Sequence, residues 1–403
     1  MSETHTAPVN LKNIKKIFFI VLLAIIADQT VDSVILEIIA PIKFSFGNIT
    51  HAYLLTSMPF ALILATWSDF HCRRKTMIFA LACLSISAIV ISCYHSFSSN
   101  WVIYTALAFK GIGGNVTPVA LASLATIVPS RKFTLYLAIA ICAYSLGILV
   151  SIYLHSFEQL PQTATLLAIL CTVIVIRSFR EKEFDNFKFQ NNTASFGKFF
   201  SFLRKDLIAI GLFSIGVSAM LALFGYLTSE ISFYQILLRG EVLGVNSFYS
   251  NLALKIGLSY YFGTFILYLL KRKNVSDARC LNAGITIALI SILLTAILYS
   301  SGINNTYVLD GTFAFFSIGF ALLTPSLFSI LSQIRRKDEQ GKIYGFLDTY
   351  DTLAAFVSVK YIGMTTSVSF TYALWLSFII LLVSALFILA FIRDIKERKI
   401  NMS

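Results

Sequence analysis

The chain has 403 residues, of which 57% are hydrophobic and only 13% charged, and its mean hydropathy is +0.79. A soluble domain carries about twice that share of charged residues, so the composition excludes a soluble protein and predicts an integral membrane protein with many crossings. The net charge of +12 does not indicate a nucleic-acid partner, because the basic residues are divided among short loops that suit anionic lipid headgroups.

Twelve apolar stretches follow one another, each near or above the roughly 20 residues that a helix needs to cross a bilayer. Helices are required there because no water satisfies the backbone polar groups. The predicted helices cover residues 16–41, 49–67, 76–95, 101–128, 133–156, 161–179, 206–235, 246–270, 280–300, 305–333, 343–365 and 370–392. This order predicts an amino-terminal tail (1–15), a six-helix bundle (16–179), a central loop (180–205), a second six-helix bundle (206–392) and a carboxy-terminal tail (393–403).

The basic residues lie almost entirely on one side of the predicted membrane. Of 32 Lys and Arg, 27 fall at the helix ends and in the loops of one side, and Lys43 and Arg239 are the two in loops of the other. Basic residues are retained in the cytoplasm during insertion, so both termini and the central loop are predicted to be cytoplasmic. Frequent Lys, Phe, Ile and Asn, together with short loops, favour a bacterial cytoplasmic (inner) membrane.

The two predicted bundles share a local pattern that indicates an internal duplication. The fourth helix contains Gly111 to Pro118 with a Thr-Pro pair, and the tenth contains Gly319 to Pro325 with another pair 207 residues later. Each pair is followed by a basic loop at a similar distance. Pro118 and Pro325 each remove a helical hydrogen bond and are expected to allow bending. The glycines of the fourth helix are expected to allow a close approach to the first.

The loop between the second and third predicted helices carries a charged motif. Its residues Ala65 to Thr76 read A-T-W-S-D-F-H-C-R-R-K-T. With twelve crossings, a six-plus-six duplication and a long central loop, the motif resembles the major facilitator superfamily pattern G-x-L-x-D-R-x-G-R-[KR]-x. Asp69 matches the acid, and Arg73 and Arg74 match the basic pair. The chain departs from the pattern at Ala65, Trp67, Phe70 and Cys72.

This resemblance implies an all-α integral membrane fold of 12 transmembrane helices, arranged as two pseudo-symmetric six-helix bundles. It also implies that Asp69, Arg73 and Arg74 form an inner gate that holds an outward-open state. The alternative is that the basic residues only anchor the loop and that Asp69 caps a helix. The counterpart loop, Lys271 to Arg279, keeps charge without the pattern, and we interpret it mainly as a determinant of orientation.

Several ionisable residues lie at membrane depth, where each costs at least about 2.5–3.5 kcal/mol on insertion scales. Asp28 and Asp32 share one face of the first helix. In the resembling family, helices 1, 4, 7 and 10 line the central cavity and helices 2, 5, 8 and 11 flank it. Asp28 and Asp32 are therefore predicted to carry the coupling proton. The predicted substrate contacts are Lys110, Thr117, Lys255 and Asp351.

A structural alternative exists for each of these charges, because pairs such as Asp32–Lys110 or Asp351–Lys255 could simply tie helices together. Asp348 lies near the inner end of the eleventh helix and could be a solvated residue. Lys110 occupies a position where the family has Gln, and no Arg precedes it, so the proton handling assigned to that Arg does not transfer to this chain.

We predict a proton-coupled secondary transporter, a symporter that moves a small polar, anionic solute by alternating access. Uptake is favoured because the fifth helix lacks the Gly-Pro-rich signature of the family's antiporters. One alternative is a proton antiporter that exports amphipathic drugs or a siderophore, and another is a non-transporting membrane sensor. The chain has no phosphate-binding G-x-x-x-x-G-K-[ST] loop and no metal or nucleophile motif. We therefore expect no enzymatic activity and no cofactor, and a monomer whose partners are its solute, protons and lipid.

Overall fold

The computed structural model describes residues 11–39, 46–94, 99–155, 160–178, 245–303, 306–334, 339–365 and 370–400. The predicted central loop (180–205) and the predicted seventh helix (206–235) lie outside these ranges. Lys43 and Arg239 lie outside them as well.

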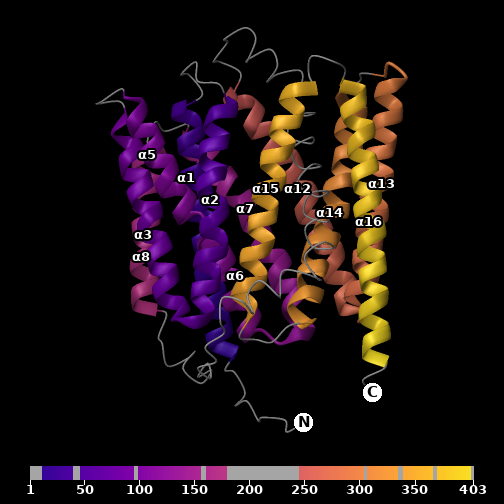
Figure 1. Cartoon of the computed structure of the whole chain (residues 1–403), viewed down its shortest axis with the longest axis horizontal. Coiled ribbons are helices and arrows are strands. Elements are labelled where there is room, and N and C mark those ends of the chain that lie inside the picture. The colour runs from indigo at the N-terminus through magenta and orange to yellow at the C-terminus, as the bar shows by residue number, and fades with distance from the viewer. Residues whose placement is uncertain are drawn as a thin grey trace.

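Every regular element in the described ranges is an α-helix (Figure 1). The amino-terminal half contributes α1 (Leu11–Ile39), α2 (Phe46–Phe70), α3 (Arg73–Ser92), α5 (Asn100–Gly113), α6 (Val116–Ile127), α7 (Ser130–His155) and α8 (Leu160–Ser178). The carboxy-terminal half contributes α12 (Val245–Arg272), α13 (Asp277–Ser300), α14 (Thr306–Ile334), α15 (Gln340–Thr365) and α16 (Phe370–Ile400).

Large apolar side chains cover the outside of the described helices. Trp101 is 80% exposed, Leu166 65% and Phe315 63%. So much exposed apolar surface suits lipid rather than water. Among the described segments, three are long and apolar enough on length and composition to cross a membrane: residues 73–92, 277–300 and 314–333.

The helices of the two halves pack in corresponding pairs. In the first half α3 contacts α5 and α8, and α5 contacts α2; in the second half α13 contacts α14 and α16, and α14 contacts α12. The halves meet where α2 packs along α15 and where α7 packs along α12. These two junctions are also related by the duplication, because the second helix of each half meets the fifth of the other. Figure 1 shows α2 and α15 side by side in the middle of the molecule.

The predicted single helix 101–128 is instead two helices, α5 and α6, which meet at Gly114 and Asn115. Pro118 contributes to the break because it has no N–H to donate to the Gly114 carbonyl, and the N–H of Thr117 reaches that carbonyl only at 3.4 Å. Proline alone does not explain it, since α14 continues through Pro325. The difference lies in the Gly-Gly-Asn run before Thr117, which disfavours helix in the first half only.

The glycines of α5 do not serve the predicted contact with the first helix alone. A Cβ on Gly113 would come within 3 Å of the backbone of Leu84 in α3, and one on Gly111 would press against Thr56 and Ser57 of α2. Gly114 is the one that faces α1, since a Cβ there would lie 3.4 Å from the Asp28 carboxylate. The expectation for Gly111 and Gly113 was therefore wrong: they let α5 approach α2 and α3.

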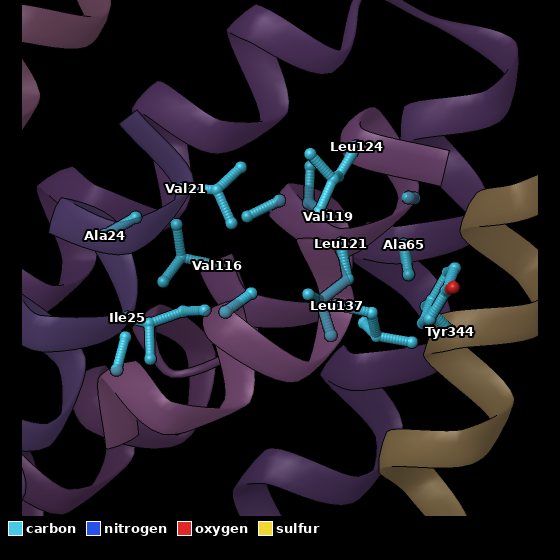
Figure 2. Close-up of a cluster of buried hydrophobic side chains, with 14 of the residues drawn as sticks. Val21, Ala24, Ile25, Ala65, Val116, Val119, Leu121, Leu124, Leu137 and Tyr344 are labelled. Atoms are coloured by element: carbon cyan, nitrogen blue, oxygen red, sulfur yellow. The ribbon is translucent and has the colours of Figure 1, made fainter. Parts of the chain in front are cut away.

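One apolar core runs through the first half and reaches α15 of the second. All twelve residues of α6 are buried. Figure 2 shows Val119 and Leu124 of α6 among side chains of α1 and α7, with Ala65 and Tyr344 at one edge of the cluster. Tyr344 is only 1% exposed and belongs to α15, so the core itself crosses the junction between the halves.

Candidate functional site

Lys110 lies in the last turn of α5, and its side chain is fully enclosed. Its Nζ atom is 2.6 Å from Oδ1 of Asp28 and 3.0 Å from Oδ1 of Asp32. Both aspartates belong to α1, four residues apart on one face. The Asp28 side chain is 6% exposed and that of Asp32 30%. The structure thus unites three predicted site residues in one cluster, which we call the Lys110 centre (Asp28, Asp32 and Lys110).

The Lys110 centre holds two carboxylates but one ammonium group. With all three ionised it carries one excess negative charge. Charges interact strongly where water is scarce, and an uncompensated buried charge is costly. The centre is therefore a place where one added positive charge, such as a proton, would be stabilised.

The break between α5 and α6 lies directly beside this centre. Asn115, in the break, donates from Nδ2 to the carbonyls of Gly111 at 2.6 Å and Ile112 at 3.3 Å, and reaches that of Ser57 at 3.5 Å. These bonds satisfy carbonyls at the end of α5 that have no partner within the helix. The Asn115 Oδ1 atom is buried and has no hydrogen-bond partner among the described residues. Irregular backbone at membrane depth is tolerated where it is buried in protein or lines a cavity, and it often marks a binding site.

Thr117 lies in the first turn of α6, beside Asp28. Its hydroxyl is buried and close enough to interact with the Asp28 carboxylate. Thr117 and Lys110, both predicted substrate contacts, belong to separate helices that meet at the break.

Asp348 was expected near the inner end of its helix as a residue that could be solvated, and it lies in the third turn of α15, counted from Gln340. It lies on α15 within electrostatic range of both Asp28 and Lys110. Its side chain is partly buried. Asp348 is therefore a charged neighbour of the Lys110 centre that comes from the other half.

Lys255 and Asp351, the substrate contacts predicted from the second half, lie on α12 and α15. Their side chains are outside the described residues, so their part in the site stays a prediction.

The predicted gate residues form a bonded cluster between the halves. Asp69, at the end of α2, is 3.0 Å from Nη2 of Arg73. Its carboxylate accepts hydrogen bonds from the backbone N–H groups of Gly341 at 2.7 Å and Lys342 at 2.8 Å. Because α15 begins at Gln340, Asp69 acts as an N-cap supplied by the opposite half. Asp69 therefore caps a helix, as the alternative expected, but that helix belongs to the other half, and the gating role stays a prediction.

Arg73 extends the cluster to α6. Its Nη1 donates to the Ala122 carbonyl at 2.7 Å and to the Thr126 hydroxyl. Arg73 is 4% exposed, so its charge depends on these bonds. Arg74 points elsewhere and donates to the Ile176 carbonyl at the end of α8, 2.5 Å away. Arg73 pairs with Asp69, and Asp69 bonds to α15, so Arg73 is linked to both halves. The bond of Arg74 lies within the first half.

The loop Lys271 to Arg279, interpreted as a determinant of orientation, carries a second polar cluster between the halves. Asp277, the first residue of α13, binds Lys271 and lies 2.7 Å from the Thr134 hydroxyl of α7 and 3.2 Å from that of Ser329 in α14. Gln333 donates to the same carboxylate at 3.2 Å. The interpretation of this loop was too narrow, because Asp277 joins α13 to the opposite half as Asp69 joins α2 to α15.

A sequence signal for this second cluster existed. Asp277 follows Asp69 by 208 positions, and the two Thr-Pro pairs are 207 apart. The two offsets differ by only one position, so the duplication would have paired the acids of the two loops. For Asn115, the signal was a Gly-Gly-Asn run in the middle of a membrane helix. No pattern placed Asp348, since its approach to Asp28 depends on how the two halves pack.

Comparison with known proteins agrees with this arrangement. The sequence model of the Major Facilitator Superfamily matches residues 17–359. The chain belongs to the Major Facilitator Superfamily. Among curated proteins, none matches it.

Solved structures of the superfamily share the fold at low identity. The human organic anion transporter MFSD10 superposes with a TM-score of 0.71 at 15% identity, covering 91% of this chain and 99% of that one. An E. coli fucose:proton symporter, FucP, gives 0.71 at 13% identity, covering 94% and 98%. A bacterial homologue of ferroportin in an outward-facing state gives 0.72 at 14% identity, covering 94% and 99%. The protein is thus an integral membrane Major Facilitator Superfamily transporter, with the all-α fold predicted from the sequence.

Proposed function

We propose that this transporter is a proton-coupled symporter of a small polar, anionic solute, with the Lys110 centre as its coupling site. The supporting observation is the enclosed ammonium of Lys110, 2.6 Å and 3.0 Å from two carboxylates of α1. A proton on Asp28 or Asp32 would remove one of the two carboxylates that compete for the ammonium. An anionic group of the solute could then take the place of that carboxylate. Proton and anion would bind together, which is the requirement for symport.

The position of the Lys110 centre supports the same proposal. It adjoins a helix break, the Thr117 hydroxyl beside Asp28, and the Asn115 Oδ1 atom, which has no partner among the described residues. Buried polar groups without partners are uncommon in proteins, and a polar solute would supply the missing hydrogen bonds. Thr117 is accordingly proposed as a substrate contact, together with Lys110, Lys255 and Asp351.

Alternating access needs a gate at each end, and one gate must stay closed while the other is open. We propose that Asp69 and Arg73 close the end that bears the basic loops, and that Arg74 braces α3 against α8. Protonation or displacement of Asp69 would release two backbone N–H groups of α15 and the guanidinium of Arg73 together. We further propose that this end is cytoplasmic, in a bacterial inner membrane, and that the protein works as a monomer.

The test is uptake into proteoliposomes under an imposed pH gradient, screened over radiolabelled dicarboxylates, amino acids, sugar phosphates and iron chelates. A symporter accumulates its solute when the outside is acidic, and a protonophore abolishes the accumulation. Asp28→Asn or Asp32→Asn should lose accumulation but keep exchange of labelled for unlabelled solute, since exchange needs no net proton movement. Unchanged gradient dependence in both variants would refute the coupling site.

The rival functions give different outcomes in the same vesicles. A proton antiporter exporting amphipathic compounds or a siderophore would accumulate its solute under the reversed gradient. A membrane sensor would move none. The acidic Lys110 centre gives an exporter of cationic compounds some support, because protons and a cation would then compete for the same carboxylates.

A further inference from the structure

Asp348 belongs to the opposite half from the Lys110 centre, yet it lies at the same level of the molecule. The connection runs through α2. A Cβ on Gly111 would touch the backbone of Ser57, and the Asn115 amide reaches the Ser57 carbonyl. One residue further, the Met58 carbonyl accepts a hydrogen bond from Thr349 of α15 at 3.2 Å.

Asp348 precedes Thr349, so its backbone lies at the level of the α2 segment that contacts the turn after Lys110. The level of the backbone follows from these bonds and this packing. It agrees with the charge interactions that join Asp348 to Asp28 and Lys110.

The surroundings of Asp348 provide few other charges. Helix α15 packs against α2, α6, α14 and α16. No charged residue occurs in α6. Asp69 of α2, paired with Arg73, and Lys342 lie about two turns away at the start of α15. Asp310 is near the opposite end of α14, and α16 has its charges from Arg393 onward. On α15 itself, Asp351 is one turn further along. Among the described side chains, Asp348 forms no ion pair, so its charge is met by Asp28 as a repelling group and by Lys110 as an attracting one.

Lys110 is already shared between two carboxylates of α1. With Asp348 ionised, three described carboxylates lie near the one ammonium group of Lys110. Like charges at this depth repel strongly, and the cost falls as soon as one carboxylate takes up a proton.

We propose that Asp348 is a second proton-binding residue of the coupling site, supplied by the carboxy-terminal half. This inference rests on the proposed function and adds the second half to its proton chemistry. When Asp28 and Asp348 are both ionised, their repulsion opposes the approach of α15 to α1. A proton on either residue removes that repulsion, so the proton occupancy of one half sets how closely the other can approach.

The experiment uses the full-length protein in lipid vesicles and dicyclohexylcarbodiimide as the probe, without any solute. This apolar reagent modifies carboxyl groups in their protonated form, and peptide mass spectrometry then identifies the modified residue. We expect labelling of Asp348 and of Asp28 at about pH 6 that is several-fold lower at about pH 8, a range in which ordinary Asp and Glu side chains remain ionised. Glu339, which is 4.0 Å from Lys342 and 30% exposed, serves as the internal control for labelling outside the Lys110 centre.

A second measurement counts the protons that the purified protein takes up between about pH 8 and pH 6. Asp348→Asn should take up about one proton fewer than the wild type, and Glu339→Gln the same number. Labelling of Asp28 without Asp348, or an unchanged count in Asp348→Asn, would overturn the inference and leave the Asp28 site standing. Absence of pH-dependent labelling at both residues would instead remove the proposed coupling site itself.

Discussion

Two carboxylates of the neighbouring helix α1 compensate the buried charge of Lys110. The effect of replacing Lys110 on stability can therefore be predicted. Removing one partner of a buried ion pair leaves the other charge uncompensated, at a cost of about 3–5 kcal/mol. Lys110→Met keeps much of the side-chain volume and leaves Asp28 and Asp32 facing each other without a cation. We expect it to lower the free energy of unfolding by about that amount, measured by thermal denaturation in detergent.

The control for Lys110→Met is the double variant with Asp28→Asn. Because the two residues are in contact, their effects should not add, and the double variant should recover part of the lost stability. If the two effects simply summed, the 2.6 Å contact would carry no net coupling and Lys110 would be held by its packing alone.

The residues of the Lys110 centre could be predicted from the sequence, whereas the ion pairs that they form could not. The sequence predicts that Asp28, Asp32 and Lys110 need compensation, because charges at membrane depth are costly. It leaves open whether Lys110 pairs with α1 or with the solute. Helical spacing relates residues within one helix only, so the pairing between α1 and α5 was decided by packing.

At the scale of helices, glycine packing gives a prediction with a matched control. A Cβ on Gly113 would lie 2.6 Å from the backbone N of Leu84, whereas one on Gly311 of α14 would meet no atom of the described residues within 4 Å. Gly113→Ala must push α5 away from α3, and we expect it to destabilise the protein by about 1–3 kcal/mol.

Gly311→Ala should instead be neutral or stabilising by up to about 1 kcal/mol, because it reduces the conformational freedom of the unfolded chain without a clash. Both variants would be compared by thermal denaturation in the same detergent. Equal stability of the two alanine variants would contradict the close packing of α5 on α3.

The helix bounds follow from hydropathy for most of the described elements, as α3 and α8 illustrate. The fourth predicted helix is the exception, because hydropathy averages over the Gly-Gly-Asn run that breaks it. Helix propensity does record that run. The two glycines of α14, Gly311 and Gly319, are separated, and α14 stays continuous through Pro325. Asn115 makes the difference in the structure, since its amide replaces bonds that the helix loses.

For the whole molecule, Asp69 and Asp277 are two anchors between the halves at the end with the basic loops. Asp69→Asn removes the charge and places an amide N–H against a backbone N–H of α15. Hydrogen bonds to charged groups contribute about 1.5–3 kcal/mol each, enough to change a two-state population by roughly tenfold or more. We expect this end to open more often in Asp69→Asn.

The measurement is the distance distribution between spin labels at Lys75 and Lys273, both exposed and one in each half. Asp69→Asn should enlarge the population at longer distance, and Glu339→Gln should leave it as in the wild type. An unaltered distribution in Asp69→Asn would mean that the bonds to Gly341 and Lys342 do not hold this end closed.

Asp277→Asn offers an independent check of the second anchor. Its carboxylate binds Lys271 and the hydroxyls of Thr134 and Ser329, so its loss should also favour the longer distance. The two anchors share none of these partners, and effects at separate sites usually add. We therefore expect the Asp69→Asn, Asp277→Asn double variant to show about the sum of the two free-energy changes.

The sequence by itself determined the all-α membrane fold and the superfamily, because apolar length, basic loops and a duplicated Thr-Pro pattern are local properties that a chain displays before it folds. It also marked Asp69 and Arg73 through their spacing. Tertiary structure alone decided that Lys110 is shared by two carboxylates, that Asp69 caps a helix of the other half, and that Asp348 approaches Asp28. These contacts join residues 82, 272 and 320 positions apart, where neither helical period nor hydropathy constrains the distance and only the packing of one half on the other does.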